Sequence, residues 1–257
     1  MTRGFPEPAL QRARELATGA ADWQPVPPRS AATVLLLRET EQGLQTYMMC
    51  RASTMAFAAN AYVFPGGRLD PQDLDQGNEL EFDEETLASL SLRMSADFEE
   101  TRGLLICAVR ELEEEAGVTL DPHSLVLLDH WVTPEWEKLR YDVRFFIAHM
   151  PADQIAEPHG TEAVAARWVA PADAIAEANQ GSILLMAPTR AALVHLLQHS
   201  QIAALVAAAD AREIVPRMDR LHIDESGQEH WAIVHDRTGE VLELDRPVPP
   251  VEARENP

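Results

Sequence analysis

The chain has 257 residues, and its apolar share of 46% is enough for one domain of ordinary size with additions or for two small domains. Its formal net charge of −21 argues against nucleic acid or an anionic membrane surface as partner, because both attract clustered Lys and Arg. Cys50 and Cys107 lie in apolar stretches, which favours two packed thiols in a reducing compartment over a disulfide.

The sequence also favours a cytoplasmic location. The N-terminus lacks a cationic start followed by a continuous apolar stretch, so we expect no signal peptide. The most apolar region, residues 183–209, is interrupted by Pro188, Arg190 and two histidines, and this favours a pair of core-packing helices over a membrane span. We therefore expect no membrane partner.

The first predicted elements are a short helix and a β-hairpin. Residues 8–17 fit an amphipathic helix, and the prolines of residues 25–28 fit an extended linker. Two β-leaning runs, 32–37 and 44–50, flank the turn at 41–43 and predict a hairpin.

A strongly acidic segment, residues 71–101, comes next and contains a predicted helix over 84–94. Beyond it the pattern predicts three strands and two helices: residues 125–131, 143–150 and 164–169, then a helix after Pro171 and one over 188–199. We expect the acidic segment to fold away from any neighbouring site and to act as a lid or a subunit contact.

The C-terminal part predicts a small antiparallel meander over residues 220–244, followed by a loose tail after Arg246. We accordingly divide the chain into three parts: an N-terminal extension (1–29), a main domain (30–212) with the acidic segment inside it, and the C-terminal meander with its tail (213–257).

The most informative stretch is the end of a predicted helix that carries three glutamates. Glu111, Glu114 and Glu115 stand three and four positions apart, so their carboxylates share one helix face, and apolar residues occupy the other. Like charges at this spacing cost about 0.2–0.5 kcal/mol per pair, a penalty that a bound dication would remove and a solvated surface would tolerate. The alternative to a metal site is therefore an ordinary solvated acidic face.

Two segments together carry a family resemblance. Residues 110–118, Arg-Glu-Leu-Glu-Glu-Glu-Ala-Gly-Val, fill every defined position of one half of the Nudix box, and the turn formed by residues 64–67, Phe-Pro-Gly-Gly, is similar to the other half. The resemblance to the Nudix hydrolases implies an α/β fold, a Nudix α/β/α sandwich with a mixed sheet, to which this chain adds an acidic helical insertion and a small C-terminal β extension.

The resemblance also implies roles for individual residues. Mg²⁺ or Mn²⁺ would be bound by the Gly66 carbonyl and by the carboxylates of Glu111, Glu114, Glu115 and Glu162. Glu111 would also orient or deprotonate a water, and Arg110 would hold Glu111 by an ion pair rather than touch the substrate. Glu162 is equally compatible with a role as ligand, as base, or as a merely solvated loop residue.

Asp73 occupies the place at which the family pattern has another glutamate. Because the acidic segment interrupts the pattern at this point, the sequence-based interpretation leaves Asp73 out of the site.

The segment before the glycine turn resembles the motif of Nudix coenzyme A diphosphatases. Arg51 and Ala52 match that motif, whereas Ala56 and Asn60 depart from it in the way that the peroxisomal branch also departs. Arg51 would then contact a substrate phosphate, and the alternative is a strand-end arginine in solvent.

The leading hypothesis is metal-dependent hydrolysis of the phosphoanhydride of a nucleoside diphosphate derivative. Coenzyme A or acyl-coenzyme A would yield a phosphopantetheine product and adenosine 3',5'-bisphosphate. The rival hypotheses are hydrolysis of ADP-ribose or a dinucleotide, and a non-catalytic module that only binds a nucleotide. The partner is thus a small-molecule nucleoside diphosphate, and a homodimer is left open.

Overall fold

The computed structural model describes residues 7–20, 22, 24–51, 61–159 and 163–247. The chain forms two compact units. The larger unit contains Arg29–Trp131 and Tyr141–Val215, and the smaller unit contains Met1–Pro28, Val132–Arg140 and Pro216–Pro257.

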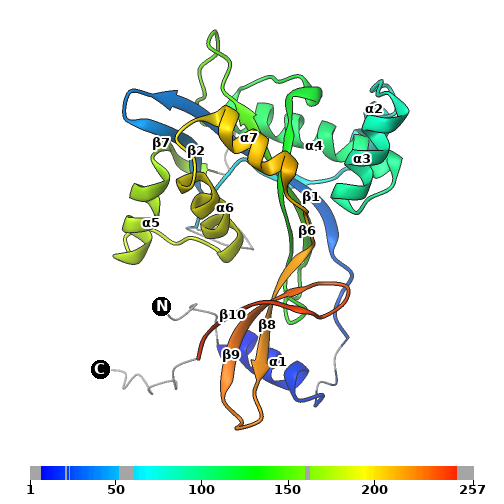
Figure 1. The fold of residues 1–257 in the computed structure, drawn as a ribbon, viewed down its shortest axis with the longest axis vertical. Helices are drawn as coiled ribbons and strands as arrows, with labels where there is room; N and C mark the ends of the chain where they lie inside the picture. The colour runs from blue at the N-terminus through cyan, green and yellow to red at the C-terminus, as the bar shows by residue number, and fades with distance from the viewer. Residues whose placement is uncertain (1–6, 21, 23, 52–60, 160–162, 248–257) are drawn as a thin grey trace. The chain divides into compact units, whose positions relative to one another are not determined.

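A mixed β-sheet forms the centre of the larger unit (Figure 1). Its strands are β1 (Arg29–Thr40), β2 (Gly43–Arg51), β3 (Tyr62–Val63), β4 (Gly66–Arg68), β5 (Val126–Val132), β6 (Tyr141–His149) and β7 (Ala163–Val169). The strand order is β5-β6-β1-β2-β3, with β4 paired to β1 and β7 paired to β2. β1 is parallel to β6 and antiparallel to β2 and β4.

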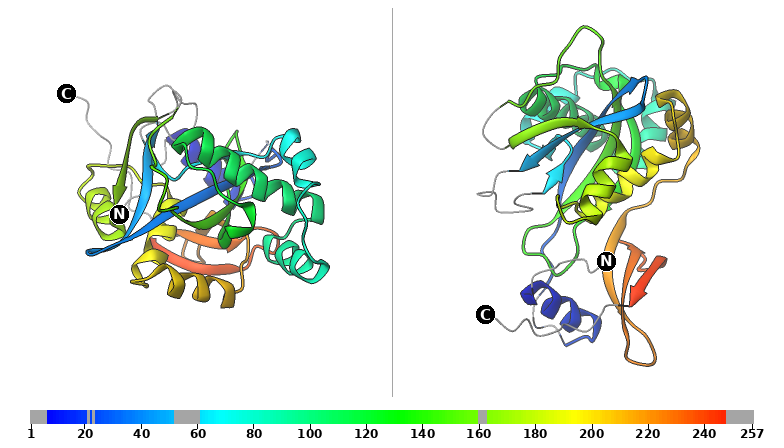
Figure 2. Two further views of the ribbon diagram at one scale, coloured as in Figure 1. Left: turned by 90° about the horizontal axis from the view of Figure 1, so that it is seen from above. Right: turned by 90° about the vertical axis from the view of Figure 1, so that its left-hand side faces the viewer.

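Helices flank both faces of this sheet (Figure 2). They are α2 (Pro71–Gly77), α3 (Glu84–Met94), α4 (Phe98–Ala116), α5 (Pro171–Asn179), α6 (Ala187–Leu197) and α7 (Ile202–Ala211), with the short 3-10 turn η1 (Pro122–Ser124). Coverage of both faces explains why the centre of β1 is a continuous apolar run rather than an alternating one. The expected strands, hairpin and helices are confirmed, and the helix expected over 84–94 is α3.

Helix α4 has clear start and stop signals. The side chain of its N-cap, Asp97, accepts a hydrogen bond of 2.8 Å from the Glu100 N–H, and the helix ends at Gly117, whose φ of 67° is the left-handed conformation that glycine tolerates. Between these ends, Leu104, Ala108 and Leu112 pack into the central core, so the opposite side of the helix is left for polar residues.

The acidic segment packs into the larger unit instead of forming a detached lid. Met94, at the end of α3, is fully buried in the core that α4 shares with the sheet. Its carbonyl accepts a 3.0 Å hydrogen bond from Nε of Arg144, a β6 side chain that is only 1% exposed. Arg144 also forms an ion pair of 2.9 Å with Asp142, which accepts a hydrogen bond from His130 of β5.

In the smaller unit, α1 (Glu7–Ala17) packs on an antiparallel meander of β8 (Arg217–Ile223), β9 (Glu229–His235) and β10 (Val241–Pro247). Leu10 and Ala13 of the helix share a small core with Leu221 and Trp231, and Arg14 forms a 2.7 Å ion pair with Glu229. The N-terminal helix and the C-terminal strands are therefore parts of the same unit.

Over the described residues, no single helix has the length and apolar character needed to cross a bilayer; α6 and α7 meet that criterion only when taken together, and they are bent by 115° at the break between them.

Candidate active site

Two glycines bring the turn after β3 against α4. Gly66 and Gly67 begin β4, where they pair with Thr33 and Ala32 of β1. A Cβ atom on Gly66 would lie 2.4 Å from the Ala32 carbonyl oxygen, and a Cβ on Gly67 would lie 2.3 Å from Oε1 of Glu111. A larger residue at position 66 would force the backbone to shift, and one at position 67 would displace the Glu111 carboxylate, so the glycines allow the acidic helix face to approach the turn directly.

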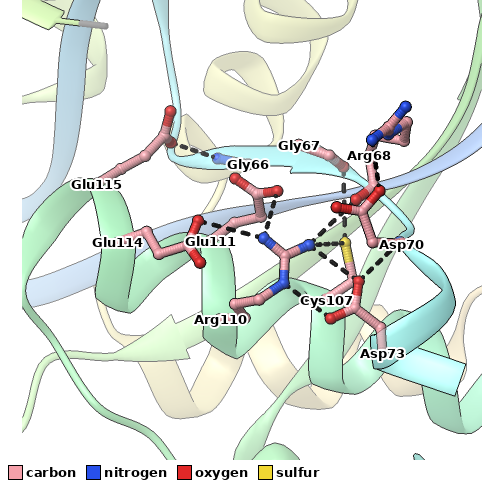
Figure 3. Close-up of polar contacts among 10 residues, drawn as sticks. All are labelled: Gly66, Gly67, Arg68, Asp70, Asp73, Cys107, Arg110, Glu111, Glu114 and Glu115. Carbon is pink, nitrogen blue, oxygen red and sulfur yellow. Dashed lines mark hydrogen bonds and ion pairs between the residues drawn. The ribbon is translucent and has the colours of Figure 1, made fainter. Parts of the chain in front are cut away.

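The three glutamates of α4 differ in their surroundings (Figure 3). Glu115 is buried, and its Oε2 accepts a 2.8 Å hydrogen bond from the Gly66 N–H. The side chain of Glu111 is 15% exposed and lies over Gly67, whereas the side chain of Glu114 is 59% exposed. The structure thus brings Gly66, Glu111 and Glu115 together as the sequence predicts, with Glu114 at the solvent side.

Arg110 links two of these carboxylates. Its Nη1 lies 2.8 Å from Oε1 of Glu111 and 3.3 Å from Oε2 of Glu114. The ion pair with Glu111 that the resemblance implies is present, and Glu114, one turn later on the helix, adds a second contact. The guanidinium therefore lies on the acidic face and is available to orient Glu111.

Asp73 completes this arrangement, although the sequence-based interpretation left it out. It is fully buried, and its two oxygens accept hydrogen bonds of 2.8 and 2.9 Å from Nε and Nη2 of Arg110. The Asp70 N–H donates a further bond of 2.8 Å to Oδ2 of Asp73. The expectation that the acidic segment folds away from the site is therefore wrong for its first helix, because α2 carries Asp73 to Arg110.

The protonation properties of the site follow from burial and crowding. Burial raises the pKa of Glu111, Arg110 opposes this, and the charges of Glu114 and Asp73 raise it further, so the pKa lies above its ordinary value. The pKa of Arg110 is raised mainly by its hydrogen bonds to Asp73.

Burial also raises the pKa of Cys107, whose thiol donates a hydrogen bond to the Gly67 carbonyl at 3.7 Å. This cysteine is therefore a packed thiol rather than a nucleophile.

The donor set suits a hard divalent cation, although the side chains are not in a preassembled ligand geometry. Carboxylate oxygens are the ligands that Mg²⁺ and Mn²⁺ prefer; three carboxylates here share a single arginine, and that of Glu115 accepts a hydrogen bond from the Gly66 N–H. In the part of the chain that the structure describes, no three His, Cys, Asp or Glu side chains converge on one metal position.

One further predicted site residue, Arg51, lies at the end of a neighbouring strand. Arg51 is the last residue of β2, and its Nε is buried without a hydrogen-bond partner among the described residues. Glu162 lies outside the described residues. His159, the last described residue before it, donates its backbone N–H to the Glu115 carbonyl at 3.0 Å, and its ring packs against Gly117.

A mixed sheet between helices, with a glycine turn pressed against an acidic helix, is the architecture of Nudix proteins. The model of the NUDIX domain family matches residues 27–187, more than half of the chain, so the chain belongs to this family and has the Nudix fold.

One relative and one solved structure illustrate the likeness. The chain is 25% identical over 181 residues to "Putative nudix hydrolase 7" of Caenorhabditis elegans, a match that covers 66% of this chain and 61% of that protein, less than two thirds of its length. The crystal structure of a NUDIX hydrolase from Alicyclobacillus acidocaldarius is similar at a TM-score of 0.58 and 22% identity, over 71% of this chain and 96% of that one. The structural likeness supports the fold.

Proposed function

We propose that this protein hydrolyses the phosphoanhydride bond of a nucleoside diphosphate derivative with the help of a divalent metal ion. The observation that carries the proposal is the charge imbalance around Arg110: Asp73, Glu111 and Glu114 all form ion pairs with this single guanidinium. A surplus of carboxylates that is partly buried is costly without further positive charge. A bound dication removes that cost.

Each residue then has a distinct task. Glu111, Glu114, Glu115 and the Gly66 carbonyl would hold Mg²⁺ or Mn²⁺, and the ion would supply positive charge against the phosphates and a more acidic water. Glu111, which lies over Gly67 and is held by Arg110, would also orient the attacking water and take its proton. Arg110 positions Glu111, and Glu162 would add another carboxylate as ligand or base.

Coenzyme A or acyl-coenzyme A is the substrate that we propose first. The resemblance of the segment after Arg51 to the coenzyme A diphosphatase motif favours it, and so does the buried Nε of Arg51, which has a donor to offer to a phosphate oxygen. Hydrolysis would yield a phosphopantetheine product and adenosine 3',5'-bisphosphate. ADP-ribose or a dinucleotide is the alternative if Arg51 contributes nothing to coenzyme A turnover.

A substrate panel tests the proposal. Coenzyme A, an acyl-coenzyme A, ADP-ribose and a dinucleotide are each incubated with Mg²⁺ or Mn²⁺, with and without EDTA, and the products are identified by mass. We expect adenosine 3',5'-bisphosphate from coenzyme A and no product in EDTA. If only ADP-ribose is cleaved, ADP-ribose rather than coenzyme A is the substrate. If the protein binds a nucleotide but turns over none of the compounds, it is a non-catalytic binding module.

A further inference from the structure

Asp73 and Arg110 form a two-pronged ion pair although they lie 37 positions apart in the sequence. Asp73 belongs to α2, a helix of seven residues, and Arg110 belongs to the second half of α4. The two oxygens of Asp73 match Nε and Nη2 of Arg110 only while α2 keeps its distance and rotation relative to α4. A second contact between α2 and α4 fixes this distance and this rotation.

That second contact is glycine against glycine. A Cβ atom on Gly77 would lie 2.8 Å from the backbone N of Gly103 and 2.9 Å from the carbonyl carbon of Arg102. A Cβ on Gly103 would lie 2.7 Å from a methyl carbon of Leu74. Both glycines are buried; at Gly77 the backbones of the two helices touch directly, and at Gly103 the side chain of Leu74 packs on the α4 backbone.

Helix propensity gives no reason for glycine at position 103. Gly103 is interior to the 19-residue helix α4 and has no positive φ, and glycine at such a position is less favourable than alanine. The close approach of α2 supplies the reason. A Cβ atom on Gly77 would meet the α4 backbone, and one on Gly103 would crowd Leu74 of α2, so glycine at both positions allows α2 to lie this close to α4.

The two contacts lie on the same side of each helix. Asp73 and Gly77 are four residues apart on α2, and Gly103 and Arg110 are seven residues apart on α4, so each pair lies along one helix face. As the chain advances along α2 from Asp73 to Gly77, the contact on α4 moves back from Arg110 to Gly103. The helices are therefore antiparallel here, and a shift at Gly77 is transmitted to Asp73 one turn away.

We propose that the Gly77–Gly103 contact makes α2 a positioning brace for the active site, holding Asp73 on Arg110 and thereby Arg110 on Glu111. The catalytic part of this inference rests on the proposed function, but the brace itself does not. Gly77 and Gly103 act through Asp73 and touch neither substrate nor metal.

The test is a double-mutant cycle that combines Gly103→Ala with Asp73→Asn, read out by calorimetric Mn²⁺ binding and by kcat. We expect Gly103→Ala to weaken Mn²⁺ binding and to lower kcat, each by roughly 5–10-fold. In the Asp73→Asn background it should change either quantity less than about 2-fold, because the contact that it disturbs is already lost. Equal effects of Gly103→Ala in both backgrounds would overturn the brace, since α2 would then act by another route.

A spectroscopic readout is independent of turnover and of metal. The Nε–H of Arg110 donates to Asp73, so its NMR signal should exchange slowly in the parent and rapidly in Gly103→Ala and Gly77→Ala. Leu92→Ala, at a side chain on α3 that is 81% exposed, is the control and should leave the signal unchanged. A rapidly exchanging signal in the parent contradicts the brace even if the glycine variants fail to fold.

The same readouts separate the two proposals. If the substrate panel shows no hydrolysis but the Arg110 signal and Mn²⁺ binding respond as expected, the proposed function is wrong and the brace stands. If hydrolysis is found and the signal does not respond to either glycine variant, the brace is wrong and the proposed function stands.

Discussion

The larger unit holds two groups of charged residues that differ in how their charge is balanced. In the group formed by His130, Asp142 and Arg144, the carboxylate is in contact with two basic side chains, and Arg144 also donates to the Met94 carbonyl. In the active-site group, several carboxylates share Arg110. The first group is matched internally, whereas the second has an excess of negative charge.

The pKa directions of the two groups reflect this difference. Burial by itself raises the pKa of Asp142, but the hydrogen bond from His130 and the positive charges of His130 and Arg144 outweigh burial, so the pKa lies below its ordinary value. Burial raises the pKa of Glu111 too, and there Arg110 is not enough to reverse it. A balanced group stabilises the fold, and an unbalanced group has a reason to bind a cation.

The largest expected effect comes from removing single charges from the unbalanced group, because this tests directly whether its carboxylates bind a metal ion. Glu114→Gln and Glu115→Gln should each lower turnover by roughly two orders of magnitude or more, because metal and general-base contributions are about 10²–10⁴-fold. Thermal unfolding should show that both variants stay folded. Near-normal activity in both would remove the metal assignment.

Arg51 tests whether positive charge beyond Arg110 serves the substrate. If Arg51 holds a phosphate, Arg51→Ala should raise KM or reduce kcat/KM for coenzyme A by an amount equivalent to about 1.5–3 kcal/mol, the range of a charged hydrogen bond. Steady-state kinetics with coenzyme A measures this. Unchanged kinetics would show that Arg51 is an ordinary strand-end residue.

The balanced group should respond in stability rather than in turnover. Asp142→Asn leaves Arg144 and His130 without their carboxylate and should lower the free energy of unfolding at pH 7 by about 1–3 kcal/mol. Because the pKa of Asp142 is lowered in the folded state, its contribution is complete above the ordinary value of 3.8 and is lost as the pH falls through the folded value.

Denaturant unfolding of parent and Asp142→Asn at several pH values checks this sign. The difference between the two proteins should shrink as the pH drops below about 4, where the unfolded carboxyl titrates. Turnover of the variant under folding conditions should stay within about 3-fold of the parent. A difference in stability that grows in acid would contradict the assigned pKa direction.

Glu113 supplies the matched control and the smallest expected effect. It stands among the three site glutamates in the sequence, but its side chain is exposed. Glu113→Gln removes the same charge from the same helix and should change turnover by less than about 2-fold and stability by less than about 0.5 kcal/mol. An effect as large as that of Glu115→Gln would mean that general helix charge, rather than a defined metal site, controls activity.

The sequence by itself determined the features that depend on short spacings. The shared face of Glu111, Glu114 and Glu115 follows from helical periodicity, and the stop at Gly117, the hairpin after β1 and helix α3 follow from local turn and capping signals. A complete half-motif in residues 110–118 also pointed to the family, which the NUDIX match confirms. Each of these depends on residues only a few positions apart.

The tertiary structure alone decided the contacts between residues far apart in the chain. Asp73 reaches Arg110 because α2 packs on α4 at Gly77, and Met94 reaches Arg144 because α3 ends in the core. Leu10 of α1 shares a core with strands from the other end of the chain. Local periodicity specifies which face of a helix or strand is apolar, but the element that packs on that face depends on the path of the whole chain. For this reason the sequence-based interpretation left Asp73 out of the site, and only the fold shows its contact with Arg110.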